Sequence, residues 1–174
     1  GVRVAHNPGS NMKLASGVAP VEKMLAAGIA VGLGTDGAAS NNNLDMIEEM
    51  RLAGLLHKVA RLDPTAVPAH VCLEMATRGG AACLGLADQI GSIEVGKRAD
   101  IVLLDFGAPH LSPAGIADPV SHLVYSASGA DVSAVVVDGC VLMDDRKLTT
   151  LDEHEIMAEV ERRAARLVRA ANAK

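Results

Sequence analysis

The segment GLGTDG at positions 32–37 ends a run of apolar residues, 29–33, that is typical of a buried strand. An acidic residue at the carboxyl end of a parallel strand can bind a divalent metal and take a proton from a water molecule. Asp36 is therefore the candidate metal ligand and catalytic base. Ser40 and Asn41, in the polar tail that follows, would line such a pocket with hydrogen-bonding groups.

Two other interpretations of this segment stay open. Its glycines match the G-x-G-x-x-G spacing of a dinucleotide-binding turn, but that motif needs a helix to begin at once, and a polar loop over 38–43 intervenes. The carboxylate of Asp36 would also repel phosphates. Alternatively, Asp36 only caps a turn, as most Asp-Gly pairs do.

A second polar segment, HNPGSNMKL at positions 6–14, also follows a short apolar strand and is expected to form a loop at the same sheet edge. His6 is interpreted as a hydrogen-bonded histidine that orients this loop rather than as a metal ligand. Asn11 and Lys13 either contact a substrate or hold the loop in place, and the sequence favours neither role.

The elements around these segments alternate between strand and helix and then change character. Strands over 2–5 and 29–33 with helices over 20–28 and 44–62 predict two βα units and a parallel sheet. Further elements are expected over 69–77 and 80–86 (helices), 99–105 (strand), 118–126 (helix), and 132–137 and 140–143 (a hairpin). Asp138-Gly139 suits a type I′ turn, and Asp152 with Glu155 predicts a capping box at the last helix.

Composition narrows the class of protein. The chain has 174 residues, of which 49% are hydrophobic, with one Phe, one Tyr and no Trp, and a net charge of −5. A core of aliphatic residues is expected, whereas a stacking platform for nucleic acid is excluded and no apolar run is long enough to span a membrane. Three cysteines without a CxxC pair indicate reduced thiols and a cytoplasmic protein.

Several long motifs, in the right order, resemble the amidohydrolase superfamily. HNPGSNMKLASGVAPV and GLGTDGAASNNNLDM are similar to its last two barrel strands, most of all in the branch of 5-methylthioadenosine/S-adenosylhomocysteine deaminases and triazine hydrolases. GSIEVGKRADIVLLD resembles the point where those chains leave the barrel for a small β-sandwich domain. Residues 132–143 resemble the sandwich hairpin that follows.

The resemblance implies an α/β fold, namely the C-terminal part of a metal-dependent-hydrolase (β/α)8 barrel with part of a small β-sandwich domain. Residues 1–90 would supply the last two βα units plus helices. Residues 91–150 would supply part of the sandwich, with a helix near 118–126 returning to the barrel, and residues 151–174 a C-terminal helix. We expect this chain to work together with an upstream remainder of the same protein, and alone to be inactive and poorly folded.

The resemblance also implies the chemistry. Asp36 matches the family's metal ligand and general base, Ser40 and Asn41 match a loop beside the substrate, and His6 and Asn11 match the strand-seven loop. One divalent metal is implied, with zinc ahead of iron. The family's His-x-His, two further histidines and proton-shuttling glutamate have no counterpart among the six histidines here, and we expect His57 and His154 to be structural or on the surface.

The implied function is hydrolytic deamination of a purine-like nitrogen heterocycle. One alternative is a sister triazine chlorohydrolase or aminohydrolase, and another is a non-catalytic module that keeps half of the fold. The expected partner is a small-molecule substrate, with no nucleic acid and no membrane. The sequence leaves open the exact substrate, the choice of zinc or iron, and whether the protein forms a homo-oligomer.

Overall fold

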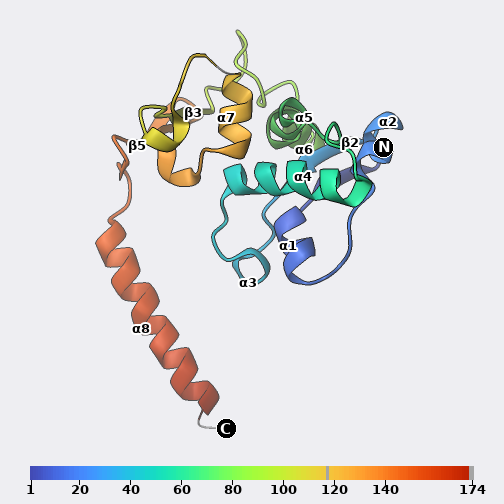
Figure 1. Cartoon of the computed structure of the whole chain (residues 1–174). Coiled ribbons are helices and arrows are strands. Elements are labelled where there is room, and N and C mark those ends of the chain that lie inside the picture. Colours follow the sequence, from blue (N-terminus) through green and yellow to red (C-terminus); the bar gives the residue numbers. More distant parts are fainter. Residues whose placement is uncertain (117, 173–174) are drawn as a thin grey trace.

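The computed structural model describes residues 1–116 and 118–172, which form a mixed α/β structure with two separate sheets (Figure 1). In the first sheet, β1 (Arg3–His6) and β2 (Ala30–Leu33) pair in parallel, in a register that runs from Arg3 opposite Ala30 to His6 opposite Leu33. The prediction of two short parallel strands is confirmed. Among the described residues no third strand joins this sheet, so each strand has one unpaired edge.

The polar segments after both strands are helical, whereas the sequence predicted loops. After β1 the chain forms α1 (Pro8–Lys13), and after β2 it forms α3 (Ala38–Asn41). Each helix has at most six residues. Such short helices draw their stability from packing rather than from propensity, and α1 lies against both α3 and α4 (Met46–Arg61).

The helices predicted on either side of β2 are present. Helix α2 (Val21–Ala26) precedes the strand. Helix α4 begins at the N-cap Asp45, whose side chain accepts hydrogen bonds from the backbone N–H groups of Ile47 and Glu48. It ends at Leu62, which adopts the left-handed conformation.

The next helical region is continuous. Helix α5 (Ala69–Glu74) passes through a π-helical turn, η1 (Met75–Gly79), into α6 (Gly80–Leu84), where the sequence predicted two helices with a break. The glycines at the junction permit close packing on β2. A Cβ on Gly79 would lie under 3.0 Å from the Val31 carbonyl oxygen, and one on Gly32 would lie 2.9 Å from the Gly80 Cα. The glycine of the G-x-G pattern at position 32 therefore serves helix–strand packing.

The second sheet is antiparallel, with strand order β3-β4-β5-β6. Its strands are β3 (Ile101–Leu104), β4 (Val132–Val137), β5 (Cys140–Asp144) and the unpredicted β6 (Lys147–Leu148). Asp138 (φ 50°) and Gly139 (φ 78°) both have positive φ between β4 and β5, which fits the predicted type I′ turn. Two 3-10 turns, Pro109–Leu111 and Gly129–Asp131, flank helix α7 (Pro119–Tyr125) in the sequence.

The core lies where helices meet the parallel sheet. Helix α7 (Pro119–Tyr125) packs against α4 and α5, while η1 and α6 pack on β2 (Figure 1). The fully buried hydrophobic side chains are aliphatic or sulfur-containing, as the composition predicted. They include Val21, Val31, Ala53, Cys72, Met75, Leu111 and Val124.

The C-terminal helix α8 (Glu153–Asn172) extends away from the rest of the chain in Figure 1, and none of its residues is buried. Asp152 Oδ1 accepts hydrogen bonds from the backbone of His154 and Glu155, which is the Asp152 half of the predicted capping box. The last two residues of the predicted segment, 173–174, lie outside the described residues. No described helix is long and apolar enough to cross a membrane.

Candidate active site

Asp36 lies three residues beyond the carboxyl end of β2 and is exposed. Its backbone adopts φ 64°, a left-handed conformation that is uncommon for residues other than glycine and that recurs at functional sites. The Asp36 Oδ1 atom accepts a hydrogen bond of 2.8 Å from the Gly37 N–H. Asp36 therefore does shape the turn, as one interpretation held, and this role is compatible with a chemical one.

Two serine hydroxyls hold the other carboxylate oxygen. Ser10 Oγ, from α1, and Ser40 Oγ, from α3, donate to Asp36 Oδ2 at 2.7 Å and 2.8 Å. Ser10 is buried, so its hydroxyl is held in place. The two polar segments thus converge on one carboxylate from consecutive βα units.

These hydrogen bonds fix the charge of Asp36. The pKa of its carboxyl group lies below the usual range because the Ser10 hydroxyl, then the Ser40 hydroxyl and the Gly37 N–H, stabilise the charged form. Each carboxylate oxygen offers about two acceptor positions. The serines occupy those of Oδ2, while Oδ1 carries one N–H donor and keeps the other position free.

A buried carboxylate on α4 makes hydrogen bonds to both α1 and α3. Glu49, 1% exposed, accepts a hydrogen bond of 3.0 Å from the Gly9 N–H and one of 2.7 Å from Asn41 Nδ2. Burial raises its pKa, while the Gly9 N–H and the Asn41 amide oppose that shift. Asn41 Oδ1 in turn accepts from the Leu44 N–H at 2.7 Å. Both ends of the Asn41 amide are therefore engaged within the protein.

His6 is buried at the end of β1 and contacts His57 of α4. The two Nε2 atoms lie 3.2 Å apart, and His6 Nδ1 has no hydrogen-bond partner. Burial, followed by the nearby His57, lowers the pKa of His6 from 6.5 to about 4. His57 is buried rather than on the surface, and the hydrogen bond expected of His6 is made to a helix rather than within its loop.

Lys13 holds the loop together. Its Nζ donates to the Ala39 carbonyl at 2.9 Å and also to Asn42 Oδ1, which ties α1 to α3. Of the two roles open to Lys13, the structure shows this one. Asn11 is half-buried on α1, and its backbone N–H bonds to the Asn7 carbonyl at 3.0 Å. Contact of Asn11, Ser40, Asn41 or His6 with a substrate stays a prediction.

Within the described part of the chain, Asp36 is the exposed carboxylate that could bind a metal at this site. Across residues 1–116 and 118–172, no three His, Cys, Asp or Glu side chains come together in a way that could hold a metal ion. The donor that Asp36 offers fits a divalent ion, because its carboxylate is ionised, exposed and keeps an acceptor position on Oδ1. His154, expected to be structural or on the surface, is exposed at the start of α8.

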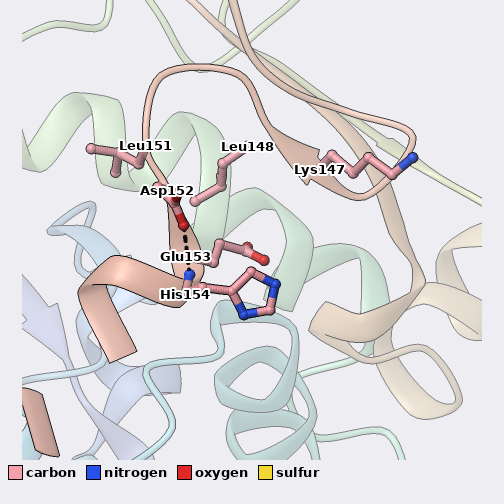
Figure 2. A pocket seen from close by; sticks show the side chains of 6 residues that line it. All are labelled: Lys147, Leu148, Leu151, Asp152, Glu153 and His154. Atoms are coloured by element: carbon pink, nitrogen blue, oxygen red, sulfur yellow. Dashed lines mark hydrogen bonds between the residues drawn. The ribbon is translucent and has the colours of Figure 1, made fainter. Parts of the chain in front are cut away.

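A shallow pocket elsewhere does not belong to this site. It has a volume of about 300 Å³ and lies where β6 meets α8 (Figure 2). Its lining includes Leu148, Leu151, Glu153 and His154, and none of the residues around Asp36. The dashed line in Figure 2 is the hydrogen bond from the His154 N–H to Asp152.

Comparison with known proteins identifies the family of this chain. The sequence profile of the Amidohydrolase family matches residues 1–142. The chain belongs to the amidohydrolase family. It is 61% identical, over 97% of its length, to a 5-methylthioadenosine/S-adenosylhomocysteine deaminase of Desulforudis audaxviator, but it spans 39% of that relative.

Solved structures agree with the family assignment. An adenosine deaminase from Xanthomonas campestris with bound zinc superimposes with a TM-score of 0.90 at 41% identity, over 95% of this chain and 37% of that one. Atrazine chlorohydrolase TrzN from Arthrobacter aurescens, complexed with zinc, gives a TM-score of 0.81 at 37% identity, over 91% of this chain and 35% of that one. The expected resemblance to the branch of 5-methylthioadenosine/S-adenosylhomocysteine deaminases and triazine hydrolases is confirmed.

Sequence reasoning missed two residues of the site, Ser10 and Glu49. Ser10 stands in the quoted HNPGSN motif, and its position after a strand was the available signal. Glu49 had no comparable signal, because it lies among polar positions of a long amphipathic helix and meets Gly9 only through the fold.

Proposed function

We propose that the complete protein is a metal-dependent hydrolytic deaminase of an adenosine-type nucleoside, such as 5-methylthioadenosine, S-adenosylhomocysteine or 5′-deoxyadenosine. The observation that carries the proposal is the ionised Asp36 carboxylate at the end of β2, held by Ser10 and Ser40. Relatives named as deaminases of these nucleosides are 61% and 54% identical to this chain. This chain spans 39% of the length of each of these two relatives, so the activity is proposed for the complete protein.

In the proposed architecture, β1 and β2 are the last two strands of a (β/α)8 barrel, and residues 91–150 contribute to a β-sandwich. The unpaired edges of β1 and β2 support this placement, since a barrel would cover both. A segment outside these residues would supply the remaining metal ligands, because the described residues bring no three together. The free cysteines fit a reducing compartment and support placement in the cytoplasm.

Asp36 has a defined task in this reaction. Bound zinc, or iron, supplies Lewis-acid activation of a water molecule at neutral pH. Asp36 would hold the ion at Oδ1, the oxygen with an acceptor position to spare. It would accept a proton from the attacking water at Oδ2 when the Ser40 hydroxyl donates instead to the Gly37 carbonyl oxygen, which lies 3.0 Å from it. Ser10 and Ser40 hold Oδ2 and keep the carboxylate in one orientation. The net reaction replaces the amino group of the ring with a carbonyl oxygen and releases ammonia.

Ser40, Asn41, His6 and Asn11 are proposed to lie beside the substrate. Ser40 and Asn11 are the strongest candidates for substrate contact, because both are partly exposed. Ser40 lies beside the Asp36 carboxylate, and Asn11 lies on the adjoining helix α1. His6 is buried against His57, so its proposed contribution is to the shape of the loop that faces the substrate.

A substrate panel tests the proposal. The full-length protein is incubated with 5-methylthioadenosine, S-adenosylhomocysteine, 5′-deoxyadenosine and the chlorotriazine atrazine, and ammonia or chloride release is measured. Ammonia release from the nucleosides is the expected result. Chloride release from atrazine alone would replace the proposal with triazine hydrolysis, and no turnover together with no bound metal would identify a non-catalytic module.

A further inference from the structure

Glu49 occupies an unusual position for a carboxylate. It is 1% exposed on α4, where the other acidic residue, Glu48, lies nearer the surface, and burial raises the pKa of Glu49. A buried carboxyl group is costly unless hydrogen bonds satisfy it. Glu49 has two donors, the Gly9 N–H at Oε2 and Asn41 Nδ2 at Oε1.

The two donors are sequence neighbours of the residues that hold Asp36. Gly9 precedes Ser10 on α1, and Asn41 follows Ser40 on α3. Glu49 therefore ties together the two short helices whose serine hydroxyls both reach Asp36 Oδ2. Neither helix exceeds six residues, so such contacts decide where its serine lies.

Space around the carboxylate is equally restricted. A Cβ on Gly9 would lie under 3.0 Å from Glu49 Oε1 and 3.1 Å from Asn41 Nδ2. Position 9 therefore brings the backbone of α1 directly onto Glu49. The Glu49 side chain is therefore a buried, tightly packed contact that joins α1, α3 and α4.

We infer that Glu49 is a positioning residue, which sets the orientation of the Asp36 carboxylate through Ser10 on α1 and Ser40 on α3. The inference rests on the proposed function, in which Asp36 binds the metal. Glu49 touches neither Asp36 nor a substrate, and it acts only through its neighbours. Its loss should leave substrate binding intact and should lower the rate of turnover.

The polarity of the junction offers a rescue experiment. In Glu49→Gln, the new NH2 group must face either the Gly9 N–H or the Asn41 amide N–H, and both are donors. Asn41 cannot turn its amide over, because its Oδ1 accepts from Leu44. In Asn41→Asp, two carboxylates would face each other. In the double variant, the amide introduced at position 49 donates to the carboxylate introduced at position 41 and accepts from Gly9, with the same net charge.

The experiment measures kcat, KM and the visible spectrum of the Co²⁺-substituted full-length protein for both single variants, the double variant and a control. Each single variant should lose about tenfold or more in kcat, the scale expected for a charge-assisted hydrogen bond, and Glu49→Gln should keep KM within about threefold. The cobalt absorption should change in both. The double variant should recover kcat and spectrum. Glu74→Gln, the same change at an exposed residue of α5, should behave like wild type.

Single variants with wild-type kcat and spectrum would overturn the inference, and so would a double variant as impaired as the singles. If Glu49→Gln does not fold, Asn41→Asp and the double variant carry the same comparison. A wild-type protein that binds no metal would overturn the proposed function together with this inference. A wild-type protein that binds metal and deaminates, with unaffected variants, would overturn the inference alone.

Discussion

The buried histidine pair predicts a loss of stability in mild acid. The Nε2 atoms of His6 and His57 lie 3.2 Å apart in the core, where protonation of either imidazole is unfavourable. Burial lowers the pKa of both, that of His6 to about 4. An unfolded chain would protonate these rings near pH 6.5.

The sign and size of the effect follow from this difference. Above pH 6.5 His6 is neutral in both states, and its contribution to stability is fully present. As the pH falls from 6.5 to 4, the unfolded state binds a proton that the folded state does not, so stability is lost. At about 1.4 kcal/mol per pKa unit, His6 accounts for a loss of about 3 kcal/mol. His57 adds to the loss in the same direction.

The assay is urea denaturation of the full-length protein, followed by circular dichroism between pH 7 and pH 4, for wild type and His6→Gln. Glutamine can still bond to His57 but does not titrate. The variant should lose about 3 kcal/mol less than wild type over this range. His154→Gln removes an exposed histidine and is the matched control. Equal losses for wild type and His6→Gln would refute the reasoning.

Two further predictions concern the backbone. Gly79→Ala should lower the free energy of unfolding by about 1–3 kcal/mol, because its Cβ would meet the Val31 carbonyl, whereas Gly37→Ala, with φ −77° and open space around it, should be neutral. Leu62→Gly should raise that free energy by about 0.5–1 kcal/mol, because Leu62 is left-handed (φ 53°) and 91% exposed. Thermal unfolding measures the stability of all three variants. A Gly79→Ala variant as stable as wild type, or a Leu62→Gly variant less stable than wild type, would contradict these predictions.

Local patterns were sufficient to predict most of the elements. The apolar run at 29–33 predicted β2, and the Asp138-Gly139 pair predicted the hairpin turn. The long helix predicted over 44–62 is α4, Met46–Arg61. Asp36 was identified as the candidate because an acidic residue follows a buried strand. These features depend on residues close together in sequence.

Features that depend on long-range contacts were not predicted. Helices α1 and α3 contain turn-forming residues such as Gly9, Ser10 and Asn41. The packing of α1 on α3 and on α4 favours the helical form. His57 meets His6 across 51 positions, and Glu49 meets Gly9 across 40. The glycines at 79 and 80 are typical of a break, yet packing on β2 keeps them helical. The sequence carried no local mark of these pairings.

The most direct test of the account compares bound metal and ammonia release for the full-length wild-type protein and Asp36→Ala. We expect the wild type to carry stoichiometric zinc or iron and to release ammonia from 5-methylthioadenosine or a related nucleoside. Asp36→Ala should have no detectable turnover and reduced metal content, because one residue supplies both ligand and base. Near-normal turnover by Asp36→Ala would contradict the central claim.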